Sequence, residues 1–287
     1  LLKSSTSSLL TTMPAIINAR IDDVGTVGFS NSFASFFSAY LGVNKLTYIF
    51  YNDSDTVLST VDVNINTGSG AFAASSATTD SGKTTIYAGV YPGNIKQHLV
   101  IPATTSYYTF QARKTSNVEV SKVYTVNIIE ECKYPVTRLC WLNEFGVWDY
   151  YNFNKKSESS TSSAKKFFNS SHGDWSGATY KSQYHSGGKK AYSVDSRGSI
   201  TLNTDYITEE SGIWLEGLIT SSEVFLIKEG STWELGDSAP TDSDYRHEIE
   251  PVVITNSSIV RKTSANQNLI SHQFTIDKSN TNNTHRL

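Results

Sequence analysis

The sequence predicts a mainly β protein, with two β-sandwich-like domains and short peripheral helices. Charged residues make up only 18% of the chain, whereas Ser, Thr, Asn and Tyr are abundant; this composition suits sheets with polar, hydrogen-bonding surfaces. Short alternating apolar runs are separated by turn residues along most of the chain. An aromatic run over residues 140–153 is typical of a hairpin that is buried in a sheet.

The length and the breaks in the apolar pattern predict how the domains are arranged. A chain of 287 residues is near the upper limit for one hydrophobic core, so two domains are expected. Charges and a proline interrupt the pattern at residues 130–135, which places the junction there. We predict an extended N-terminal arm (1–20), an immunoglobulin/fibronectin-like β domain (21–130), a mainly β domain with one helix (131–277) and a C-terminal arm (278–287).

Both arms are polar. Residues 1–10 lack the apolar core of a signal peptide. Residues 1–12 and 278–287 contain too few apolar side chains to offset the entropy that ordering costs. We therefore expect a neighbouring subunit to hold them.

A helical stripe of apolar residues begins the first domain. Its spacing predicts a helix over 32–41, which Asn31 or Ser32 caps and Gly42 ends. Such a stripe packs in the core of its own domain or, alternatively, contacts another subunit. The stripe consists of Phe33, Phe36, Phe37, Tyr40 and Leu41.

Alternating residues predict the strands that follow. Residues 66–82 are rich in Gly, Ser, Ala and Thr and predict a long loop, and residues 92–94 predict a turn. About six strands at this spacing indicate a sandwich of the immunoglobulin or fibronectin type. The expected strands lie at 46–51, 57–65, 84–90, 99–101, 107–112 and 118–129, the last two joined at residues 115–117.

The aromatic run of residues 140–153 predicts a hairpin. Its apolar pattern breaks at Asn143–Glu144 and at Gly146, then resumes. Such a hairpin is too apolar to be exposed on its own, so we expect it at the centre of the second sheet. Its predicted core or interface residues are Trp141, Trp148 and Phe153.

The rest of the second domain is expected to be β-structure with one helix. Residues 155–166 predict a polar loop or strand edge, and residues 193–203 a strand with a turn at Arg197–Gly198. Thr208 is placed to cap a helix over 209–220 that carries two glutamates in its first turn. Trp214 lies on the apolar side of that helix. Strands are predicted at 224–227, 252–255, 259–263 and 269–276.

The search for catalytic chemistry is largely negative. Residues 77–84 fit a relaxed phosphate-binding loop, but no strand is predicted before them and a strand, not a helix, is predicted after them. The acidic run from Asp237 to Glu250 lacks the order of a calcium loop and predicts a solvated loop. The six histidines have no metal-ligand spacing. We therefore predict no catalytic, cofactor-binding or metal-binding residues. Paired carboxylates for glycoside cleavage stay open, because they need only be close in space.

Charge and cysteine content add further expectations. A net charge of −3 argues against nucleic-acid binding, and no apolar segment reaches the length of a membrane span. Cys132 and Cys140 flank Pro135, so a disulfide would require the chain to fold back between them. Two reduced thiols in or near a core are expected.

The second half of the chain resembles a known family. The motif consists of Arg138, the Trp-Leu-Asn of 141–143, the Trp-Asp of 148–149, the Asn-Phe of 152–153 and the Lys-Ser of 156–157. Its pattern continues to Leu287. It is similar to virion structural proteins from tailed phages of Bacteroidetes hosts, whose members are usually assigned to the tail or baseplate. The resemblance covers residues 131–287 and implies an assembly part with no catalytic residues.

Two functions are therefore open. The first is a structural component of a phage virion, a tail/baseplate or connector ring subunit that acts by self-association and docking. Its partners would be copies of itself in a ring and other virion proteins, and it would be located in virions assembled in the host cytoplasm. The alternative is a secreted carbohydrate-binding or adhesive β-sandwich protein, in which an exposed tryptophan such as Trp175 stacks on a sugar of a host-surface glycan.

Overall fold

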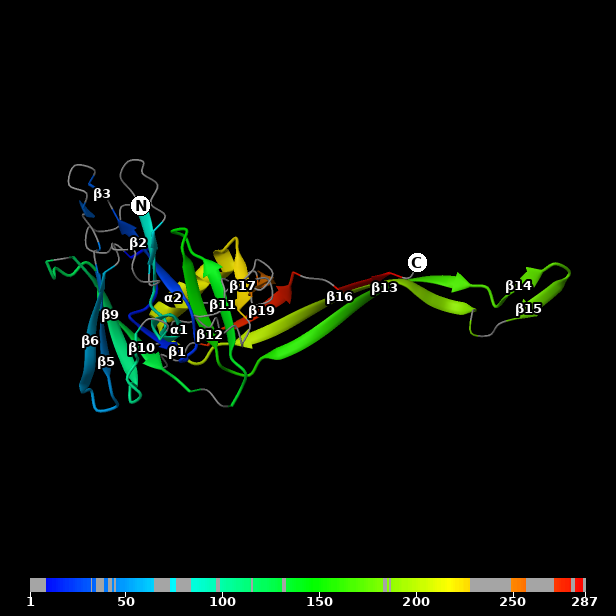
Figure 1. Ribbon diagram of the computed structural model, residues 1–287. Coiled ribbons are helices and arrows are strands. Elements are labelled where there is room, and N and C mark those ends of the chain that lie inside the picture. Colours follow the sequence, from blue (N-terminus) through cyan, green and yellow to red (C-terminus); the bar gives the residue numbers. More distant parts are fainter. Residues whose placement is uncertain are drawn as a thin grey trace.

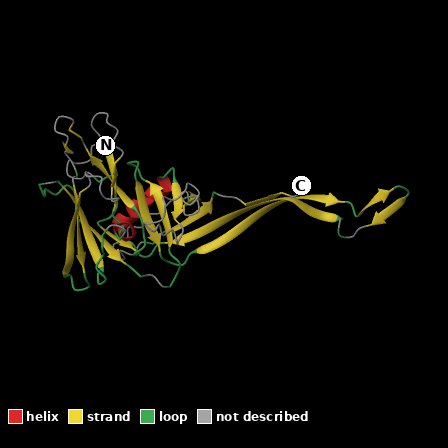
Figure 2. Ribbon diagram, in the orientation of Figure 1, coloured by secondary structure: helices red, strands yellow, loops and turns green. Residues whose placement is uncertain are grey.

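The computed structural model confirms a mainly β fold built from several sheets and two helices (Figures 1 and 2). The body of the molecule lies at one end, and a long β ribbon leads away from it. The structure describes residues 9–31, 33–34, 39–40, 43, 45–64, 73–75, 84–96, 99–114, 116–130, 133–182, 185, 187–227, 249–256, 271–279 and 282–285.

The first half forms two facing sheets. The five-stranded sheet has the order β1-β10-β9-β5-β6, and the three-stranded sheet has the order β2-β8-β7. Within the five-stranded sheet, β1 is parallel to its neighbour β10, the last strand of this half. The strands are β1 (Ile16–Ala19), β2 (Thr26–Asn31), β5 (Lys45–Tyr51), β6 (Val57–Asn64), β7 (Ala73–Ser75), β8 (Thr84–Gly89), β9 (Tyr107–Arg113) and β10 (Tyr124–Ile128).

Two buried tyrosines link these sheets. Tyr48 on β5 donates its hydroxyl hydrogen to the carbonyl of Gly89 at 3.1 Å, and Tyr108 on β9 donates to that of Val90 at 2.6 Å. The second bond reaches back 18 positions, to the start of the connection between β8 and β9. That connection holds the short helix α1 (Pro92–Ile95), where the sequence predicted only a turn.

The second half is organised around one eight-stranded sheet. Its order is β12-β11-β17-β18-β19-β16-β13, and β20 pairs with β16. The helix α2 (Glu209–Thr220) packs on it through Trp214, Leu215 and Leu218. The strands are β11 (Thr137–Leu142), β12 (Trp148–Phe153), β13 (Glu158–Ser170), β16 (Gly188–Asn203), β17 (Val224–Ile227), β18 (Ile249–Ile254), β19 (Gln273–Lys278) and β20 (Asn282–His285).

The predicted aromatic hairpin and helix are both confirmed. β11 and β12 are antiparallel, with Leu142 opposite Trp148. α2 begins after Thr208, whose side chain accepts a hydrogen bond from the backbone N–H of Ser211. The hairpin lies at the edge of the sheet, however, and not at its centre. The N-terminal segment contacts β12 there: Thr11 donates to Asp149 at 2.7 Å.

The ribbon consists of β13 and β16, paired antiparallel over the whole of β13. Beyond it lies a small tip hairpin of β14 (Gly173–Ser176) and β15 (Thr179–Ser182) (Figure 1). Thirteen residues of extended strand span roughly 40 Å. Of the two alternatives for 155–166, a polar loop or a strand edge, the second holds for residues 158–166, because β13 is an edge strand. The predicted turn at Arg197–Gly198 was wrong: these residues pair with Ser162 and Thr161 in the ladder.

The predicted helix over 32–41 was also wrong in the described part of that range. Residues 33–34 form β3 (Phe33–Ala34) and residues 39–40 form β4 (Ala39–Tyr40), which pair antiparallel with Phe33 opposite Tyr40. Aromatic residues favour strands, and here this preference prevailed over helical spacing. Phe36, Phe37 and Leu41 lie outside the described residues.

The described parts of the two predicted arms make contacts within the chain itself. Leu9 and Met13 are buried in the hydrophobic core, and β1 adds to the first sheet. Near the other end, β20 pairs with Ser193–Ser196 of the ribbon. Their backbone groups and the few apolar residues find partners in the same chain, which a count of polar side chains does not reveal.

Candidate functional site

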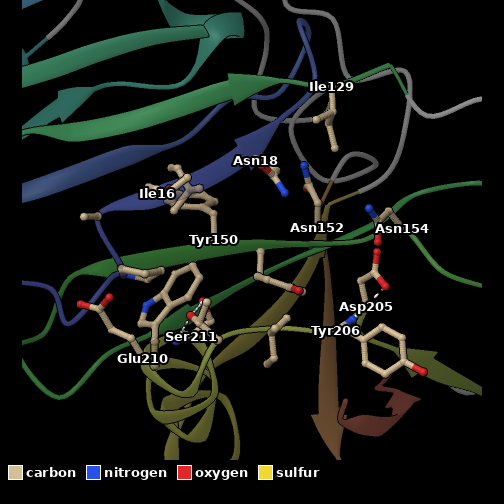
Figure 3. A pocket seen from close by; sticks show the side chains of 17 residues that line it. Ile16, Asn18, Ile129, Tyr150, Asn152, Asn154, Asp205, Tyr206, Glu210 and Ser211 are labelled. Atoms are coloured by element: carbon tan, nitrogen blue, oxygen red, sulfur yellow. Dashed lines mark hydrogen bonds between the residues drawn. The ribbon is translucent and has the colours of Figure 1, made fainter. Parts of the chain in front are cut away.

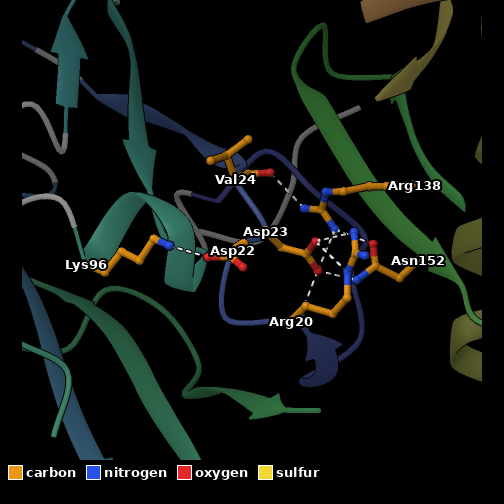
Figure 4. A network of polar contacts seen from close by, with 7 residues as sticks. All are labelled: Arg20, Asp22, Asp23, Val24, Lys96, Arg138 and Asn152. Carbon is orange, nitrogen blue, oxygen red and sulfur yellow. Dashed lines mark hydrogen bonds and ion pairs between the residues drawn. The ribbon is translucent and has the colours of Figure 1, made fainter. Parts of the chain in front are cut away.

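Buried polar groups gather where the two halves of the molecule meet (Figure 4). Arg138 on β11 and Asp23, which follows β1, are 2% and 1% exposed in their side chains, with Nη1 3.5 Å from Oδ2. Arg138 also donates to Asn152 Oδ1 at 2.7 Å and to the carbonyl oxygen of Val24 at 2.9 Å. Its guanidinium lies 4.6 Å from the ring centre of Tyr91.

Asp23 is enclosed by donors. Arg20 donates its backbone N–H to Oδ2 at 2.7 Å and its side-chain Nε and Nη2 to Oδ1 at 3.1 and 3.0 Å. Asn152 donates its amide to Oδ2. Nearby, Lys96 pairs with Asp22 (Figure 4). Because the charges of Asp23 and Arg138 are sealed from solvent, this cluster fastens one half to the other and offers no access to a substrate.

A second polar centre lies on the opposite face of the hairpin. The Asp149 carboxylate accepts hydrogen bonds from Thr11 Oγ1, from Asn143 Nδ2 at 3.1 Å and from Trp214 Nε1 at 2.9 Å. One carboxylate thus connects the N-terminal segment, the hairpin turn and helix α2. Asn143 and Asp149, two positions of the resemblance motif, occupy this junction.

An open cleft of about 390 Å³ lies between β1, β12 and the start of α2 (Figure 3). Both flanking strands are terminal in their sheets. The walls are apolar and aromatic, from Ile16, Ile129, Tyr150, Tyr151 and Trp214, and the mouth carries Asp205, Tyr206 and Glu210.

The carboxylates at the mouth are exposed and charged. A hydrogen bond from Lys155, at 2.8 Å, lowers the pKa of Asp205. Glu210 lies 3.6 Å from Lys122 Nζ. Tyr206 is 65% exposed. The cleft therefore combines an aromatic wall with two carboxylates that are already paired with lysines.

Residues 165–192, which comprise the outer part of the ribbon and the tip hairpin, are here called the distal ribbon. The distal ribbon presents large apolar side chains to solvent. Five of its aromatic residues are more than two-fifths exposed, and Trp175 is 67% exposed. Trp175 lies 5.5 Å from Tyr180 between ring centres, and Phe168 lies 6.4 Å from Tyr192. The five are Phe167, Phe168, Trp175, Tyr180 and Tyr192.

Lysines accompany these aromatics. Lys166 and Phe168 are two residues apart on β13 and therefore share a face, and Lys190 is the cross-strand partner of Phe168. With Tyr192, which contacts Phe168, these four residues form what we call the basic-aromatic face. On the other face Lys189 lies 4.4 Å from the ring centre of Phe167. Within the described residues, none of these lysines has a carboxylate partner.

The residues predicted as core or interface divide into two groups. Trp141, Phe153 and Trp214 are buried together, with Trp141 and Trp214 5.2 Å apart between ring centres. Trp148 is half-buried and contacts Phe225 at 5.5 Å. Phe33 lies in β3, and Phe37 is outside the described residues. The distal ribbon was not singled out, although the repeated Lys-Lys pairs beside aromatics at 165–168 and 189–192 were a signal for it.

The described residues contain no cluster of His, Cys, Asp and Glu able to hold a metal ion. Neither described helix has the length and apolar character needed to cross a membrane. Cys140 is a free, buried thiol, and burial raises its pKa to about 12; Cys132 is outside the described residues.

The sequence matches no protein-family model, and a search of curated proteins returned no significant relative.

Proposed function

We propose that this protein is a structural component of a phage virion that acts by self-association and docking, as a tail/baseplate or connector ring subunit. The observation that carries the proposal is the projecting ribbon with its exposed aromatic side chains. A monomer gains little from an arm whose outer part, residues 165–192, has no buried residue among those described, whereas an assembly subunit gains reach to its neighbours.

The organisation of the body also supports this proposal. The two halves are joined by buried polar clusters around Asp23 and Asp149, beside the cleft between β1 and β12. A rigid body with one protruding arm suits a subunit that must keep its shape while it contacts others. The resemblance of residues 131–287 to virion structural proteins agrees with this role.

Particles of the phage that encodes this chain provide the direct test. Mass spectrometry of purified particles should detect the chain at a fixed stoichiometry. Cryo-electron microscopy of the same particles should place it in a symmetric layer, with the ribbon in contact with another protein. Absence of the chain from purified particles would refute the proposal.

A second function, glycan binding, is favoured by the tip hairpin. Trp175 and Tyr180 are exposed neighbours on β14 and β15, and their rings are inclined by 59°. Exposed aromatic faces stack on the apolar faces of sugar rings. A glycan array that compares the wild-type chain with Trp175→Ala tests this: the function requires a signal that the substitution abolishes.

A further inference from the structure

Charge is unevenly divided between the ribbon and the rest of the chain. Residues 165–192 contain five lysines and one aspartate, a net charge of +4. Because the whole chain carries −3, all other residues together carry −7. The small net charge of the chain is therefore the sum of a basic arm and an acidic body.

Part of the negative charge of the body is concentrated in one described segment around helix α2. Residues 205–223 contain five carboxylates and no lysine or arginine. Asp205 and Glu210 have lysine partners, whereas Glu209 and Glu223 have no ion pair in the described part of the chain. Exposed Tyr206 and Ile213 lie among these charges. We call residues 205–216 the acidic face; it includes one wall of the cleft.

The two surfaces match in character and cannot meet within one molecule. Each combines charge of one sign with exposed apolar side chains. In protein interfaces, complementary charges guide association and aromatic side chains exclude water from the contact. The distal ribbon leads away from the body, whereas α2 lies within it (Figure 2). The arm of one copy reaches the acidic face only of another copy.

We propose that the basic-aromatic face of one copy docks on the acidic face of a second copy. This inference rests on the proposed self-association and names the surfaces that carry it. Lys166 and Lys190 would lie against Glu209 and Glu210, and Phe168 and Tyr192 would cover Tyr206 and Ile213. Since the two surfaces differ, the contact is head-to-tail, and repeated copies close into a ring or grow as a filament.

A charge swap in the full-length chain tests this contact. One variant carries Lys166→Glu and Lys190→Glu, a second carries Glu209→Lys and Glu210→Lys, and a third carries all four changes. Sedimentation velocity over a concentration series measures the dissociation constant of each. The control for the first variant carries Lys114→Glu and Lys133→Glu, which make the same change in net charge at two exposed residues of the body.

The two-residue swaps should each weaken association at least about tenfold, and the four-residue swap should restore it to within about threefold of wild type. The control should associate like wild type. At about 1 M salt, where the Debye length is about 3 Å, the differences should shrink. The glutamate swap also removes acidic residues from a helix N-terminus and lowers the stability of α2. The four-residue variant shares that defect, so recovery of its association cannot be a folding effect.

Several results would overturn the contact. If wild type associates and the swaps have no effect, self-association remains but uses other surfaces. If the four-residue variant does not recover, the two faces are not partners. If wild type stays monomeric, self-association fails as well. If the lysine variant loses retention on single-stranded DNA while its self-association is unchanged, the ribbon is a polyanion-binding arm instead.

Discussion

The hairpin β11–β12 and the distal ribbon are both antiparallel pairs rich in aromatic residues, yet the solvent exposure of those residues differs. Trp141 in the hairpin is fully buried, under helix α2 and beside Trp214, whereas Trp175 in the tip hairpin of the distal ribbon is exposed to solvent. The difference comes from what covers each pair. The hairpin has a helix on one face and the first half of the chain on the other, while the ribbon has only its own two faces. Aromatic content alone therefore does not distinguish a core from a contact surface.

The largest expected effect is at the hairpin. Trp141→Ala should lower the free energy of unfolding by roughly 3–5 kcal/mol, because it opens a cavity between β11 and α2. Urea denaturation followed by circular dichroism measures the change. A loss of less than about 1 kcal/mol would mean that the hairpin is not part of the core.

A somewhat smaller loss is expected at the polar junction. Arg138→Met should cost about 3 kcal/mol, because it leaves the Asp23 carboxylate buried with one cation fewer; Arg20 still donates to it. The same denaturation experiment applies. Adding Asp23→Asn should recover part of the loss, since the uncompensated charge is then gone. Independent, additive losses in the double variant would show that the two side chains are not coupled.

At helix α2, Thr208→Ala should cost about 1 kcal/mol, because the first turn loses the oxygen that accepts from Ser211 N–H. Thr208→Ser keeps a hydroxyl at that position and is the matched control. Thermal melts of both variants decide the point: equal destabilisation by Ala and Ser would contradict a capping role.

The smallest expected effect lies beyond the ribbon. Trp175→Ala should change the free energy of unfolding by less than about 0.5 kcal/mol, since its ring buries little area in the monomer. Denaturation alongside Trp141→Ala gives the direct comparison of the two tryptophans. A loss of more than about 2 kcal/mol would show that the tip is part of a cooperative core.

The sequence predicts the buried parts of this molecule better than its exposed ribbon. Where apolar residues alternate against a core, as in β5, β9 and β11, the expected strands are present. The capping of α2 by Thr208 was also predictable, because it depends on local chemistry. The outer part of the ribbon was not, because Ser and Lys there leave no apolar period to detect, although a strand over 193–203 was expected. Nor was the partnership of Asp23 with Arg138, which are far apart in sequence and meet only in the folded chain.

The N-terminal segment has a consequence for how the chain is made. Thr11 bonds to Asp149, a partner 138 positions later, and β1 pairs in parallel with β10. These long-range contacts form only after the later strands have left the ribosome. At about 5–20 residues per second, residues that emerge early wait on the order of 10 s for their partners. During that delay the apolar side chains of Leu9, Met13 and Ile17 are exposed, so a chaperone that shields nascent apolar segments would matter most for the first part of the chain to be synthesised.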